Sequence, residues 1–189
     1  MITGLFFAAQ AMSDRYTGIK YETLDCQAFV ERVLRDCGIR KPDGSIYNWK
    51  GSNSMWRNVP GWRGTIAECR TQYGEIPLGA WVFIIKNDGG EVDRGYNDGK
   101  GNASHVGIYC NNGSEPVRDS TRSSKRDGVG YRSLSSFTHV LLPSYINYDG
   151  QEDDPNEIEK AVYTLRDPNS SDVDWIEALK TVVHYMKGV

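Results

Sequence analysis

Two short apolar runs rich in strand-forming residues constrain the fold of this chain more than any other feature. They are AWVFIIK at 80–86 and HVGIYC at 105–110, separated by Gly- and Asp-rich turns. A third run, PVRDST at 116–121, follows NNGSE as a hairpin partner would. Residues 4–12 and 24–37 come before these runs and have helical spacing. Helices followed by strands predict an α+β fold, with N-terminal helices packed on an antiparallel β-sheet.

The remaining segments predict how the chain is divided. Residues 45–78 are interrupted by Gly, Pro, Asn and Trp, which indicates an irregular connection. From Tyr148 the acidic, turn-rich sequence YDGQEDDPNE is typical of a linker or exposed loop. The stretch SSDVDWIEALKTVVHYMK then has capping residues and helical spacing of its apolar residues. We therefore expect a main domain at 1–146, an acidic linker or loop at 147–170 and a helical appendage at 171–189.

Composition excludes several classes of partner. The formal net charge of -3 offers no basic stripe for nucleic acid, so we expect no nucleic-acid partner. The apolar run of MITGLFFAAQAMSDRY lacks a positive segment before it and is too short to span a bilayer. We therefore predict a core-packing helix there, no signal peptide and no membrane span, with the protein made in the cytoplasm.

Metal and cofactor patterns are missing from the sequence. The acidic run NDGGEVDRGYND lacks the spacing of a calcium loop, no Cys/His cluster has zinc spacing, and no phosphate loop is present. We expect neither a metal nor a cofactor. Without a secretory signal, the four cysteines are expected to be reduced.

The stretch TLDCQAFVERVLRDCG places a cysteine in the first turn of the predicted helix. Cys26 shares its face with the apolar residues Phe29, Val30, Val33 and Leu34, so the thiol should point inward. Unpaired N–H groups and the helix dipole at that end stabilise a thiolate, and Asp25 is a candidate N-cap. The alternative is that Cys26 is a small, inert core residue.

A thiolate nucleophile requires an imidazole that pairs with it and protonates the leaving group. The chain has three histidines, His105, His139 and His184. His105 opens an apolar strand after the loop NDGKGNAS, where a side chain can face a cleft at a sheet edge. A lone histidine is usually structural or exposed, and it is the surrounding sequence that favours His105.

Four segments together resemble one enzyme family. LDCQAFVERVL, PLGAWVFI, ASHVGIYCNNG and VRDST occur in the order and approximate spacing of the NlpC family of cell-wall cysteine peptidases. The resemblance covers roughly Leu5 to Ile146. The segment GSNSMWRNVPGWRGTIAECRTQYGEIPLGAWVFI is also similar to versions in phage lysins and tail-associated wall hydrolases. The resemblance implies a papain-like fold for the main domain.

The resemblance also assigns roles to residues of this chain. It implies Cys26 as the nucleophile and His105 as the base. Family members commonly have a histidine at the third position, whereas the matching position here is Asp119, whose carboxylate could hold the imidazole tautomer. A register shift of one residue would instead place Arg118 there, and only one of the two can reach the site because adjacent strand residues face opposite sides.

A tyrosine upstream of the cysteine lies near the oxyanion in this family. RYTGIKYETLDC offers Tyr16 and Tyr21, and Y-x-G before the cysteine favours Tyr16. The backbone N–H of Cys26 would be the second donor. Either tyrosine could instead be a packed aromatic side chain. The aromatic residues Tyr47, Trp49, Trp56 and Trp62 could line a sugar- or peptide-binding groove, or serve packing.

The function implied by the resemblance is hydrolysis of an amide bond in peptidoglycan stem peptides, with a γ-D-glutamyl to diamino-acid bond as the target. The alternatives are an N-acetylmuramoyl-L-alanine amidase with the same residues, a non-catalytic wall-binding phage or tail protein, and an acyltransferase, because a thioester can be passed to an amine or alcohol. Fold analogy alone does not separate these activities.

Overall fold

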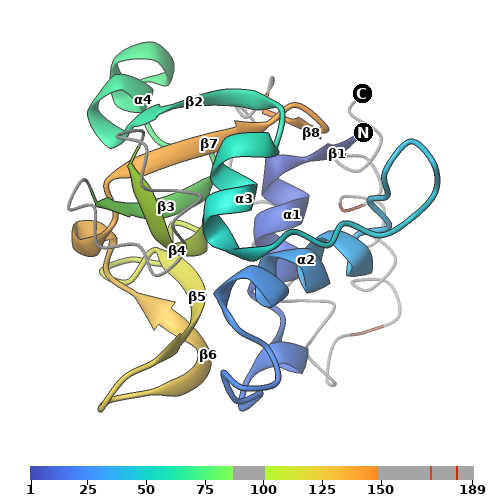
Figure 1. Cartoon of the computed structure of the whole chain (residues 1–189), viewed down its shortest axis with the longest axis vertical. Helices are drawn as coiled ribbons and strands as arrows, with labels where there is room; N and C mark the ends of the chain where they lie inside the picture. Colours follow the sequence, from blue (N-terminus) through green and yellow to red (C-terminus); the bar gives the residue numbers. More distant parts are fainter. Residues whose placement is uncertain (87–100, 149–170, 172–181, 183–189) are drawn as a thin grey trace.

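A six-stranded antiparallel sheet forms the centre of the molecule (Figure 1). The structure is a computed structural model, and it describes residues 1–86, 101–148, 171 and 182. The strand order is β2-β7-β3-β4-β5-β6. The bounds of these strands are β2 Gly61–Thr65, β3 Trp81–Lys86, β4 Asn102–Tyr109, β5 Val117–Arg122, β6 Asp127–Arg132 and β7 His139–Pro143.

Three helices contribute side chains to the larger of two clusters of buried apolar residues that adjoin the sheet. They are α1 (Gly4–Ala11), α2 (Cys26–Asp36) and α3 (Gly51–Asn58), and both α2 and α3 contact β4. Their apolar side chains are buried together with those of Trp81, Phe83 and Val106 from the sheet. The 3-10 turn η1 (Asp14–Tyr16) connects α1 to the segment that leads into α2. This packing fixes the first turn of α2 against the sheet.

Helix α4 (Ile66–Tyr73) contributes to a second, smaller cluster. Cys69 of α4 is buried there with Val82, Val117 and Val140. Alternate residues of β3 thus enter different clusters, since Trp81 and Phe83 belong to the first and Val82 to the second. The 3-10 turn η3 (Leu134–Ser136) and Phe137 adjoin this second cluster.

The predicted α+β class is confirmed, as are the principal elements of the main domain. The helices expected at 4–12 and 24–37 are α1 and α2, and the three strands expected from the apolar runs are β3, β4 and β5. The hairpin expected between the second and third runs is also present, because β4 pairs antiparallel with β5.

The prediction that residues 45–78 are irregular is wrong. This segment contains α3, β2 and α4, and each depends on a contact that a helical or alternating pattern does not reveal. The α4 helix begins at a capping box in which Thr65 and Glu68 exchange hydrogen bonds. β2 is held by antiparallel pairing with β7, a strand more than seventy residues later in the chain. In α3, the only buried residue is Met55.

Two short strands join the ends of the described domain. β1 (Ile2–Thr3) pairs in parallel with β8 (Ile146–Asn147). Tyr148 follows β8, and its hydroxyl donates to the carbonyl of Gly79 at 3.2 Å. Apart from Asn147, Tyr148, Ser171 and Val182, the predicted acidic linker and C-terminal helix lie outside the described residues. Within the described part of the chain, no helix is both long and apolar enough to cross a membrane.

Candidate active site

Cys26 is the first residue of α2, and the helix is capped immediately before it. The Asp25 carboxylate accepts a hydrogen bond of 2.8 Å from the N–H of Ala28, as the predicted N-cap should. Phe29, Val30, Val33 and Leu34 are buried on the inward face, and Cys26 itself is 7% exposed. The thiol therefore lies at the positive end of the helix dipole, at the margin of the core.

His105 lies on β4 and makes polar contacts with two other candidate residues. Its Nε2 is 2.7 Å from Oδ2 of Asp119, and its side chain also interacts with that of Cys26. Because Nε2 faces the carboxylate, Nδ1 is the ring nitrogen left for the sulfur. The imidazole thus lies between a thiol and a carboxylate, the order that a thiolate-imidazolium pair requires.

Asp119 reaches the imidazole from the neighbouring strand. β5 pairs with β4 at Tyr109–Val117 and Ile108–Arg118, and the same register continued places Asp119 opposite Gly107. A Cβ added to Gly107 would lie 3.2 Å from Cβ of Asp119, so the absence of a side chain there leaves room for the carboxylate. Asp119 is fully buried.

The adjacent residue Arg118, the alternative in a shifted register, points elsewhere. Its Nη2 donates to Oγ1 of Thr17 at 2.9 Å, and its guanidinium lies over the ring of Tyr131. The two-residue alternation of the strand therefore places Asp119, and not Arg118, beside His105. A carboxylate beside His105 stabilises the protonated ring, whereas a guanidinium there would destabilise it.

The charge state of His105 follows from these neighbours. Burial alone would disfavour the charged ring, but the hydrogen bonds to Asp119 and Cys26 outweigh burial and raise the pKa of His105 to about 9. The ring is therefore protonated at neutral pH and loses its proton only as the pH rises through about 9. A cationic imidazole beside the sulfur stabilises a thiolate.

Two arginines of the β5–β6 region also bind Asp119, and sequence reasoning missed them. Arg126 donates to Oδ1 of Asp119, and Nη1 of Arg132 lies 3.5 Å from Oδ2. Arg126 lies over Gly130, where an added Cβ would be 2.5 Å from Nη1 of the arginine. The buried carboxylate is thus compensated by guanidinium groups as well as by the imidazole. Arginines in a turn-rich stretch such as RSSKRDGVGYR usually suggest a solvated surface, so the sequence offered no signal for this role.

The structure does not place Tyr16 at the site. Its hydroxyl donates to Oδ2 of Asp36 at 2.9 Å and accepts from the side-chain amide of Gln10 at 3.1 Å. Asp36 is the last residue of α2, ten residues after Cys26, and ten residues of helix rise about 15 Å. Tyr16 is fully buried against Phe29 and acts as the packed aromatic side chain that was the alternative. The preference for Tyr16 as an oxyanion donor is therefore corrected.

Tyr21 is the tyrosine that contacts the nucleophile candidate. Its side chain interacts with that of Cys26. Burial, followed by the negative charges of Cys26 and Asp25, raises the pKa of Tyr21 to about 12. The hydroxyl consequently keeps its proton throughout the physiological range and is available as a hydrogen-bond donor.

The segment that carries Tyr21 is held by contacts with the β5–β6 hairpin. The hydroxyl of Ser120 donates to the carbonyl of Leu24, and the N–H of Val129 donates to the carbonyl of Ile19 at 3.3 Å. The N–H of Tyr21 itself donates to Asp127 at 3.3 Å. The hairpin that carries Asp119 therefore also positions the residues just before Cys26.

The other cysteines have environments that suppress ionisation. Burial raises the pKa of Cys37 to about 12, that of Cys69 to about 11 and that of Cys110 to about 12. None of the four cysteines, all of which lie in the described ranges, forms a disulfide. Cys26 is the cysteine whose side chain interacts with that of His105.

The aromatic residues of the connecting segment mainly pack against one another and the sheet. Trp56 contacts Phe83 and His139, and Trp62 contacts Tyr73. Tyr47 stacks on Trp49 with ring centroids 4.7 Å apart. Burial lowers the pKa of His139, which lies on β7 in contact with Trp56. These contacts favour the packing role over a binding groove.

Neither a metal site among the described residues nor a matching known protein gives further information about function. Within residues 1–86 and 101–148 and the two isolated described positions, no group of three or more His, Cys, Asp or Glu side chains could hold a metal ion. Comparisons with protein-family models, curated proteins and solved structures found no match. The geometry of the site places a thiol, an imidazole and a buried carboxylate in series.

Proposed function

We propose that the chain is a papain-like cysteine hydrolase that cleaves an amide bond in peptidoglycan stem peptides. The observation that carries the proposal is the series Cys26–His105–Asp119, in which the His105 ring is hydrogen-bonded to Asp119 and interacts with the Cys26 side chain in the first turn of a helix. Nucleophile, base and orienting group in hydrogen-bonding contact are the arrangement used for acyl transfer. The preference for a wall peptide comes from the resemblance of four segments to the NlpC family.

The proposed reaction begins with attack of the Cys26 thiolate on the substrate carbonyl carbon. The carbonyl oxygen becomes an oxyanion, to which the Cys26 N–H and the Tyr21 hydroxyl donate hydrogen bonds. His105 then gives its proton to the departing nitrogen, the C–N bond breaks, and a thioester and a free amine form. Water attacks the thioester and gives one proton to His105. The C–S bond then breaks, which releases a carboxylic acid that ionises in solvent and regenerates the thiolate–imidazolium pair.

Asp119 and the two arginines act on this cycle through His105. The carboxylate fixes the ring orientation and stabilises the imidazolium. Arg126 and Arg132 compensate the charge of the buried Asp119 carboxylate in addition to His105.

The decisive experiment compares the wild-type protein with Cys26→Ser and Cys37→Ser on purified cell walls. We expect Cys26→Ser to lower the release of soluble peptides by about 10³-fold or more, because a serine hydroxyl is not ionised by His105 at neutral pH. Cys37→Ser is the matched control and should retain activity. Equal release by wild type and Cys26→Ser would rule out the proposed mechanism.

Analysis of the released fragments distinguishes the related activities. Mass spectrometry of an endopeptidase digest should show cleaved stem peptides still attached to glycan. An amidase would release intact stem peptides from the glycan. Transfer of the acyl group to an added amine instead of water would identify an acyltransferase. Binding to walls without any covalent change would indicate a non-catalytic wall-binding protein.

A further inference from the structure

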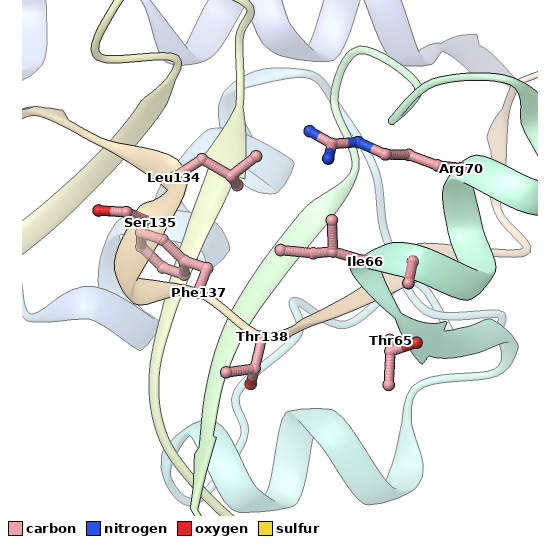
Figure 2. A pocket seen from close by; sticks show the side chains of 8 residues that line it. Thr65, Ile66, Arg70, Leu134, Ser135, Phe137 and Thr138 are labelled. Atoms are coloured by element: carbon pink, nitrogen blue, oxygen red, sulfur yellow. The ribbon is translucent and has the colours of Figure 1, made fainter.

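A pocket of about 590 Å³ lies between the start of α4 and the η3–β7 segment (Figure 2). Ile66 from α4 and Leu134 and Phe137 from the opposite wall give it an apolar lining, and Figure 2 shows the Arg70 side chain extending from α4 toward Leu134. The volume is within the range of about 300–1,000 Å³ that is common for small-ligand sites. One or two amino-acid residues of a substrate would fit.

Phe137 connects this pocket to the candidate active site. Its ring lines the pocket, and its centroid is 5.9 Å from that of the His105 ring. Arg132, which contacts Asp119, also has its guanidinium 5.6 Å from the centre of the Phe137 ring. A single aromatic side chain, that of Phe137, therefore lies between the pocket and the imidazole.

The polar side chains at the pocket differ in whether they already have a hydrogen-bonding partner within the protein. Thr65 and Glu68 are committed to the capping box of α4, and the Thr138 hydroxyl accepts a hydrogen bond from the N–H of Ile85. Arg70 is exposed, and the part of the chain that the structure describes gives its guanidinium neither a hydrogen bond nor an ion pair. The free charge of the pocket is therefore a cation beside an apolar surface.

A guanidinium beside an apolar surface indicates which kind of ligand the pocket would bind. A guanidinium binds a carboxylate through two parallel hydrogen bonds, and an aliphatic group removes the apolar walls from water. We propose that the pocket is a substrate subsite for a residue near the scissile amide that has an aliphatic stem and a free carboxylate. This inference rests on the proposed function for the identity of the substrate, whereas binding to the pocket can be measured without catalysis.

Binding is tested in the Cys26→Ala protein, so that hydrolysis has no part in the result. The probes are N-acetyl-leucine and its carboxamide, followed by backbone NMR shifts. We expect the acid to shift the signals of residues 65–70 and 134–138, and the amide to bind about tenfold more weakly, because it lacks the charge-assisted hydrogen bonds. No shifts at these residues, or equal affinity for acid and amide, would overturn the proposal.

One variant and a control locate the binding. Arg70→Gln should reduce affinity for the acid to that for the amide. Arg35→Gln, an exposed arginine on α2, should leave binding unchanged. Unaltered binding by Arg70→Gln would contradict the subsite.

Kinetics then separate this inference from the proposed function. If the wild type cleaves wall peptides, Arg70→Gln should raise KM more than it lowers kcat, since Arg70 does not touch the reacting atoms. An unchanged KM would overturn the subsite while leaving the hydrolase intact. Carboxylate-dependent binding by a protein that cleaves no wall peptide would support the pocket and refute the hydrolase.

Discussion

Helix α2 has a cysteine at each end, and the two have opposite surroundings. Cys26 is the first residue, where the helix dipole is positive and where His105 and Tyr21 contact the sulfur. Cys37 is the C-cap, next to Asp36 and at the negative end. Burial and then the charge of Asp36 raise the pKa of Cys37 to about 12. The comparison teaches that position along the helix and the partners of the sulfur, and not burial alone, determine its chemistry.

The same contrast holds for the two tyrosines. The Tyr21 side chain interacts with that of Cys26 at the N-terminal end of α2, whereas the Tyr16 hydroxyl is hydrogen-bonded to Asp36 at the C-terminal end. Both side chains have a pKa raised to about 12, with burial as the largest cause. Their similar acidity therefore conceals different roles, which depend on which end of the helix each hydroxyl reaches.

The largest expected effect is on the alkylation of the two cysteines. At pH 6 iodoacetamide should modify Cys26 at least about 10³-fold faster than Cys37, because only a thiolate reacts and Cys37 is almost entirely protonated. Peptide mass spectrometry after timed quenching measures both rates in one sample. Equal rates would show that the two ends of α2 do not differ in reactivity.

The two tyrosines provide the next test. We expect Tyr21→Phe to lower kcat about 100-fold, the usual cost of removing one oxyanion donor. Tyr16→Phe should leave kcat within about twofold and lower the free energy of unfolding by about 1 kcal/mol, because a hydrogen bond to a carboxylate is lost. Steady-state kinetics and urea unfolding of both variants measure these changes. Reversed effects would return the oxyanion role to Tyr16.

A smaller change in activity is expected when the charge of the Asp119 carboxylate, which is hydrogen-bonded to His105, is removed. Asp119→Asn retains an acceptor for Nε2 but no longer stabilises the imidazolium, so activity at pH 7 should fall about tenfold. In the wild type, kcat/KM should decline on the alkaline side as the pH rises through about 9, where His105 loses its proton. Because the raised pKa depends partly on Asp119, this decline should move to lower pH in the variant. An unmoved alkaline limb would show that Asp119 does not tune the ring.

The smallest effect concerns the cap that begins α2. Asp25→Ala should lower the free energy of unfolding by about 1 kcal/mol, since the Ala28 N–H loses its acceptor. Asp25→Asn keeps an acceptor and should recover most of that loss. Chemical denaturation of both variants measures the difference. If both variants match the wild type, the cap does not hold the first turn that presents Cys26.

Much of the fold could be predicted because its elements have local signatures. The amphipathic spacing after Cys26 identified α2, and apolar runs identified β3 and β4. Within segment 45–78, β2 was missed because it exists only through pairing with β7, and a pairing partner so distant leaves no local pattern. The same is true of β6, where Gly128 and Gly130 weaken the strand signal, yet pairing with β5 forms the strand. The Thr65–Glu68 capping box that begins α4 is a local signal, and it was overlooked.

The sequence by itself determined that Cys26 begins a helix, that His105 lies on a strand, and that Asp119 and Arg118 face opposite sides of the next one. These follow from the helical and strand periods, which act over a few residues. Only the tertiary structure decided that Tyr21 and not Tyr16 meets the sulfur, and that Arg126 and Arg132 surround Asp119. For Tyr21 the physical reason is that its position depends on how the segment before Cys26 packs on a hairpin about a hundred residues later, which chain periodicity does not encode. The two arginines reach Asp119 within the β5–β6 hairpin, through side-chain directions that the strand pattern leaves open.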